Sequence, residues 1–129
     1  MNLYSKHQPF KQCRVCLRCW EELTNFVTDR SLEVNGYQAS FDDVEEGLIL
    51  FTHLEEGCHT TLAVRAGELK KLYSGPKYEM RNTGKESCEG HCLNTGDVGP
   101  CAAECDMRWV REVLQILRNH ELPDQLLLV

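Results

Sequence analysis

The sequence has no run of about eighteen apolar residues, so no part of it is predicted to span a membrane. Its first ten residues also lack an apolar core followed by a small-residue cleavage site, which argues against a secretory signal. A chain that is not exported stays in a reducing compartment, where disulfides rarely persist. We therefore expect a cytoplasmic protein whose cysteines are mostly thiols.

Positive charge is scarce as well. Fourteen Lys and Arg residues stand against twenty Asp and Glu residues, and the formal net charge is −6 at pH 7. A chain with this net negative charge is poorly suited to binding the phosphate backbone of nucleic acids, so nucleic acid is not an expected partner. There is no glycine-rich phosphate loop, no His-Glu-x2-His and no Gly-x-Ser-x-Gly. These absences favour binding or regulation over catalysis and leave room for an unidentified protein partner.

Cysteine, by contrast, is abundant, with eight in 129 residues. Four form two Cys-x3-Cys pairs, Cys88 with Cys92 and Cys101 with Cys105, in a Cys-rich subregion (82–106) of what we expect to be a single domain (1–129). The linker 94–100 is rich in Asn, Gly, Asp and Pro, which reverse the chain and direct the second pair toward the first. Four converging sulfurs suit a metal ion, an iron–sulfur cluster or two disulfides. The expected reducing compartment favours a metal ion, with zinc as the first choice.

Three further cysteines form the N-terminal pattern Cys13-x2-Cys16-x2-Cys19. On a continuous helix Cys13 and Cys16 would share a face while Cys19 rotated away, so the three thiols can meet only if the segment forms a turn. Pairs of Cys with this spacing are common zinc half-sites, and three of them open many iron–sulfur motifs. The Cys-Pro that usually completes such a cluster motif is absent. The alternative is a helix in which Cys13 and Cys16 are small buried hydrophobic residues.

The fourth ligand for these N-terminal cysteines is expected in a β-hairpin over residues 47–65. Strand alternation places His53 and Cys58 on one face of the hairpin and His59 on the other. We expect Cys58, His53 or His59 to be the missing ligand. The pair His53 and Cys58 also permits a thiol activated by an imidazole, or a buried thiol beside a hydrogen-bonded histidine.

The other segments predict the fold class. Asn35-Gly36 is the strongest two-residue turn signal and predicts another hairpin over residues 31–41. Helical spacing of apolar residues predicts helices within 9–27, over 66–73 and, most clearly, over 102–119. We therefore expect an α+β domain, in which a small antiparallel sheet of about four strands (two hairpins) packs against N- and C-terminal helices and carries a Cys-rich loop.

The leading hypothesis for function is a zinc-binding protein with a structural or regulatory role, because closed four-ligand sites leave no position for a substrate. An iron–sulfur or thiol redox protein is the first alternative. A cysteine-nucleophile enzyme that uses Cys58 and a nearby histidine is the second. The candidate metal ligands are Cys13, Cys16, Cys19, His53, Cys58, His59, Cys88, Cys92, Cys101 and Cys105.

Overall fold

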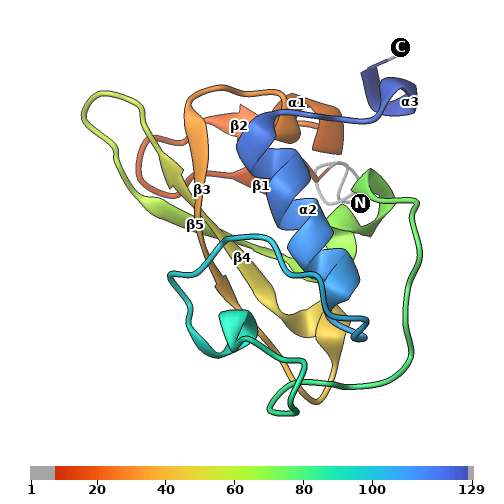
Figure 1. Ribbon diagram of the computed structural model, residues 1–129. Helices are drawn as coiled ribbons and strands as arrows, with labels where there is room; N and C mark the ends of the chain where they lie inside the picture. Colours follow the sequence, from red (N-terminus) through yellow and green to blue (C-terminus); the bar gives the residue numbers. More distant parts are fainter. Residues whose placement is uncertain (1–7, 128–129) are drawn as a thin grey trace, which may run out of the picture.

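The computed structural model describes residues 8–127. Residues 1–7, which form most of the segment used to argue against export, and residues 128–129 lie outside that range. The centre of the molecule is a three-stranded antiparallel sheet in the order β3 (Leu32–Gln38), β4 (Leu48–His53) and β5 (Thr61–Arg65). Helix α2 (Arg108–Asn119) lies across one face of this sheet (Figure 1). The predicted α+β class is confirmed.

A second, two-stranded sheet is formed near the N-terminus by β1 (Lys11–Gln12) and β2 (Cys19–Trp20), and α1 (Leu23–Val27) follows it. The remaining helices are short. They are the 3-10 helices Val44–Glu46, Ala66–Leu72 and His91–Leu93 and the four-residue helix α3 (Asp124–Leu127). Within residues 8–127, no helix has the length and apolar character needed to cross a lipid bilayer.

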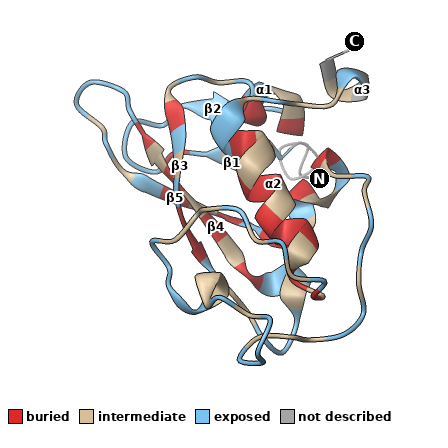
Figure 2. Cartoon of the chain, viewed as in Figure 1, coloured by how far each residue is buried: buried red, intermediate tan, exposed pale blue. Residues whose placement is uncertain are grey.

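The hydrophobic core lies between the sheet and the helices, where the buried positions of α2 and of the strands face each other (Figure 2). Along β4 the side chains alternate, so that Ile49, Phe51 and His53 are buried and their neighbours are partly exposed. Phe26 of α1 packs its ring edge-on against Phe51, with ring centroids 4.9 Å apart. The alternation therefore places a histidine among core residues at the end of β4.

The predicted hairpin at Asn35-Gly36 is wrong. Both residues lie within β3, which pairs with β4 along its whole length and shifts register between Val34 and Gly36. The glycine serves close packing instead of a turn: a Cβ at position 36 would lie 3.0 Å from the carbonyl oxygen of Thr95. The same carbonyl accepts a hydrogen bond of 2.9 Å from the backbone N–H of Tyr37. The Cys-rich loop thus packs on β3 at the place where a turn was predicted. A local turn signal contains no information about this contact with a distant segment.

The hairpin predicted over residues 47–65 is confirmed as β4 and β5, with Thr52 paired to Thr61. The sheet accordingly has three strands and not the four that we predicted. A second hairpin does exist, but it is β1–β2, in a segment where the apolar spacing predicted a helix. Only residues 23–27 of that segment are helical.

Helix α2 begins at Arg108, six residues later than predicted. The chain before it is held by another segment: the backbone N–H of Asp106 donates to the carbonyl of Met80, and the carboxylate of Asp106 binds Arg81 through two hydrogen bonds of 2.7 and 3.0 Å. These contacts with residues 80–81 replace helical hydrogen bonds around Cys105. Cys101 and Cys105 are therefore in irregular chain and not on one helical face.

Candidate metal centre

The first two thiols of the candidate centre come from the turn that joins β1 to β2. The backbone N–H of Cys13 donates to Arg18 (2.8 Å), and that of Leu17 donates back to Cys13 (2.9 Å). Leu17 adopts a left-handed conformation with φ 65°, which lets the chain reverse within a few residues. The result is a tight knuckle with Cys13 buried at its base and Cys16 exposed.

The other two groups come from the β4–β5 hairpin. His53 is the last residue of β4 and is fully buried, with its ring packed edge-on against Trp20 at 5.2 Å between centroids. Cys58 lies in the loop between the strands, where its backbone N–H donates to the carbonyl of Glu55 (2.9 Å) and Gly57 has a positive φ of 83°. This loop turns Cys58 back toward the end of β4.

The knuckle and the hairpin meet at their thiols and imidazole. The sulfurs of Cys13 and Cys58 lie 3.5 Å apart, and the sulfur of Cys16 lies 3.5 Å from Nδ1 of His53. Ligand atoms of all four residues lie within 4.8 Å of one another, and among residues 8–127 no other group of three or more His, Cys, Asp or Glu meets this condition. Tetrahedral zinc with Zn–S of about 2.3 Å and Zn–N of about 2.0–2.1 Å places its ligand atoms about 3.5–3.8 Å apart. The four residues fit one such ion.

The surroundings of this Cys3His group act differently on its thiols. Burial raises the pKa of Cys13, but the backbone N–H groups of Cys16 and Val15, with the side chains of His53 and Cys58, outweigh it and lower the pKa to about 6. At Cys58 the backbone N–H of Thr60 lowers the pKa, whereas burial and the neighbouring thiols raise it, and the net direction is upward. One thiolate is therefore favoured at neutral pH, and a bound cation would favour the others.

Cys19 and His59 lie outside this group. Cys19 is exposed in β2, where its sulfur is 3.3 Å from a carboxylate oxygen of Glu21. Partial loss of solvent and then this carboxylate raise the pKa of the Cys19 thiol. His59 is exposed and adopts a left-handed conformation with φ 51°. Of the six residues expected around the knuckle, the structure brings together Cys13, Cys16, His53 and Cys58.

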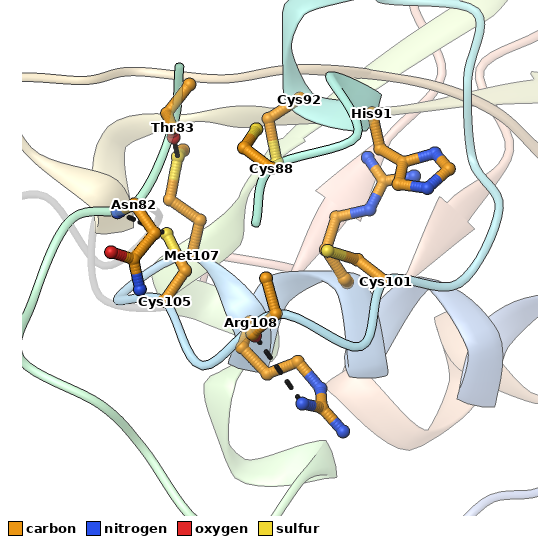
Figure 3. A pocket seen from close by; sticks show the side chains of 11 residues that line it. Asn82, Thr83, Cys88, His91, Cys92, Cys101, Cys105, Met107 and Arg108 are labelled. Carbon is orange, nitrogen blue, oxygen red and sulfur yellow. Dashed lines mark hydrogen bonds between the residues drawn. The ribbon is translucent and has the colours of Figure 1, made fainter. Parts of the chain in front are cut away.

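The other four cysteines line a small cavity between the Cys-rich loop and α2. Figure 3 shows Cys88 and Cys92 close together, with Cys105 and Cys101 apart from each other on either side of them. Their sulfurs do not all lie within the 4.8 Å that the first group satisfies. The sulfur of Cys88 accepts a hydrogen bond from the backbone N–H of Gly90 (3.3 Å), and that of Cys105 accepts one from Asn82 (3.2 Å). All eight cysteines of the chain are free thiols.

Two residues of these sites were missed in the sequence. Trp20 covers His53, and Arg111 lines the cavity of the second group with only 1% of its surface exposed. Arg111 follows Met107 by four residues and precedes Leu114 by three, so it lies on the core face of α2. A charged residue on an apolar helical face was a signal that the sequence contained.

Comparisons of this chain with protein-family models, with curated proteins and with solved structures found no match.

Proposed function

We propose that this protein binds one zinc ion through Cys13, Cys16, His53 and Cys58, and that the ion has a structural role. The observation that carries the proposal is the convergence of three sulfurs and one imidazole nitrogen, from two separate hairpins, within 4.8 Å. Three thiolates and an imidazole are a donor set typical of structural zinc, which prefers four ligands in a tetrahedron.

Zinc is favoured over an iron–sulfur cluster by the same geometry. In a four-iron cluster each cysteine binds a different iron and therefore stands apart from the others, whereas these four ligand atoms lie within 4.8 Å of one another. Cys19, the third thiol of the Cys-x2-Cys-x2-Cys pattern, does not join them.

The position of the site supports a structural role. Strands β1 and β2 have two residues each, and a two-stranded hairpin of this kind is hardly stable alone. Its links to the large sheet include the contact of Trp20 with His53 and a hydrogen bond of 2.8 Å from Lys11 Nζ to the carbonyl of Ala63. An ion bound by two ligands from each side would fasten the knuckle to the β4–β5 hairpin. With four protein ligands it would have no open position for a substrate.

A cysteine nucleophile at Cys58 is not favoured by these residues. Activation by His53 would require a lowered pKa at Cys58, and the pKa is raised. The thiol with the lowered pKa is Cys13, which is fully buried and out of reach of a substrate. An unidentified protein partner and a cytoplasmic location stay predictions from the sequence.

The proposal is tested by removing one exposed ligand and one exposed cysteine that is not a ligand. Cys16→Ser should lose one equivalent of zinc per chain, measured by elemental analysis after gel filtration, whereas Cys19→Ser should keep the wild-type content. At free zinc a thousandfold above the Kd, binding contributes about 4 kcal/mol to the free energy of unfolding, so Cys16→Ser should unfold at a clearly lower temperature.

Two results would contradict the proposal. One is the same zinc content in wild type and Cys16→Ser. The other is bound iron with broad visible absorption that Cys16→Ser abolishes, which would indicate a cluster in place of zinc.

A further inference from the structure

Buried polar atoms without hydrogen-bond partners are costly and need an explanation. Among residues 8–127 only four such side-chain atoms occur: Nε2 of His53, Oη of Tyr37, and Nε and Nη1 of Arg111. His53 belongs to the proposed zinc site. The other three atoms belong to Arg111, which lines the cavity of the second group of cysteines, and to Tyr37 beside it.

Arg111 is anchored at one end and free at the other. Its Nη2 donates to the carbonyl of Asp97 (2.9 Å) and to that of Gly99, and lies 3.2 Å from the Asp97 carboxylate. Its guanidinium carbon is 6.0 Å from the centre of the Tyr37 ring. These contacts hold a buried cation in place, but they leave Nε and Nη1 without an acceptor in a space lined by thiols.

Arg111 has one carboxylate partner among residues 8–127, Asp97, which lies 3.2 Å from Nη2. Asp97 also binds Nδ1 of His91 at 2.8 Å, and Nε2 of His91 lies 3.1 Å from Glu89, so the two basic side chains share two carboxylates. Neither carboxylate reaches Nε or Nη1 of Arg111, and a buried guanidinium is favoured by further hydrogen-bond acceptors. Four thiolates around a divalent ion would supply a net double negative charge next to it, and sulfur accepts N–H hydrogen bonds.

The cavity has room for one ion. Its volume is about 20 Å³, slightly more than a single water molecule requires, and its lining includes Cys88, Cys92, Cys101, Cys105 and Arg111. The surrounding chain, residues 82–105, contains only the 3-10 helix His91–Leu93, so the loop can close around an ion without breaking a larger helix or a strand.

We propose that this cavity is a second metal site, in which Cys88, Cys92, Cys101 and Cys105 bind one thiophilic divalent ion such as zinc and Arg111 donates hydrogen bonds to the bound thiolates. The thiols release their protons on binding, and nothing is oxidised. The four sulfurs draw together as the loop closes. The second site does not depend on the ion at the Cys3His group, because the two groups share no residue.

The test counts metal ions in the full-length protein by native mass spectrometry after loading with zinc. Wild type and Cys19→Ser should carry two ions, Cys101→Ser one, Cys16→Ser one, and the double variant Cys16→Ser/Cys101→Ser none. If Cys101→Ser loses an ion and Cys16→Ser keeps the wild-type number of ions, the first proposal alone is overturned. If Cys16→Ser loses an ion and Cys101→Ser keeps the wild-type number, the second proposal alone is overturned. If Cys101→Ser fails to fold, wild type loaded with cadmium-113 provides the readout: it should give two resonances, one of them in the range of all-sulfur coordination.

Arg111 is tested in the Cys16→Ser background, where only the second site remains. Arg111→Met should weaken zinc binding about ten- to a hundredfold in competition with a chelator, and Arg111→Lys, which keeps the charge, should recover part of that loss. Equal zinc affinity in Cys16→Ser and in its Arg111→Met and Arg111→Lys derivatives would show that Arg111 takes no part in the site. A single zinc in wild type, with four alkylatable thiols in the second group or with disulfides among them in the intact mass, would overturn the site itself.

Discussion

Nδ1 of His53 lies 3.5 Å from the sulfur of Cys16, although 37 residues separate the two in the sequence. The opposite ring nitrogen, Nε2, points toward Glu55, whose nearest carboxylate oxygen is 3.9 Å away. The edge-on contact with Trp20 holds the ring in this orientation. The imidazole therefore directs Nδ1, and not Nε2, toward the thiols.

We predict that zinc-loaded His53 is in the Nε2–H tautomer, because the lone pair of Nδ1 is used by the metal. Long-range nitrogen–proton NMR spectra of the loaded protein should show this tautomer, and chelation of zinc should shift the His53 signals. The exposed His59, which lies outside the group, should keep its signals and serves as an internal control. A proton on Nδ1 in the loaded protein would contradict the prediction.

We predict that Gly36→Ala destabilises the fold by about 1–3 kcal/mol, because the new methyl group would press against the Thr95 carbonyl and Leu50, at 3.0 and 3.2 Å. Gly96→Ala is the matched control in the loop that contacts β3: its nearest neighbour would be at an ordinary 3.8 Å, and its free energy of unfolding should change by less than about 0.5 kcal/mol. Chemical denaturation measures both. Equal midpoints for the two variants would show that the loop does not pack on β3 as described.

We predict a pH-dependent contribution from the pair of His91 and Asp97. Hydrogen bonds from Asp97 and then Glu89 raise the pKa of His91 above 6.5, and the Gly99 N–H and His91 lower the pKa of Asp97 below 3.8. The His91 part is complete below pH 6.5 and is lost as the pH rises through its folded pKa. The Asp97 part is present above pH 3.8 and is lost on acidification. The pair therefore stabilises the loop most between these values.

An NMR titration of the His91 ring checks this pair. Asp97→Asn should reduce the His91 pKa more than Glu89→Gln does, because Asp97 is the larger cause and Glu89 is mostly exposed. A larger effect from Glu89→Gln would reverse the assignment of partners.

Patterns that act over a few residues were enough to predict part of this protein. The hairpin predicted over residues 47–65 identified β4 with His53 at its end, and the apolar stripe after residue 107 identified α2. Cys58 was expected in the second strand, but it lies in the loop before β5, so strand alternation does not explain its position. The same local reasoning failed at Asn35-Gly36, because that turn signal does not include the loop that packs on Gly36 through Thr95, 59 residues later in the chain. It also extended α2 too far, because the hydrogen bonds around Asp106 come from residues 80–81.

The sequence by itself determined the chemistry that is available: eight thiols, their pairing in Cys-x2-Cys and Cys-x3-Cys spacings, and a histidine at the end of a strand. Only the tertiary structure decided which of them meet. Cys13 and Cys16 reach His53 and Cys58 because Trp20 packs on His53 and Phe26 packs on Phe51, which seats the knuckle on the large sheet. The same packing leaves Cys19 facing solvent. Spacing along a chain sets which side chains share a local face, but contacts between distant segments depend on the burial of apolar surface, and that is decided by the whole fold.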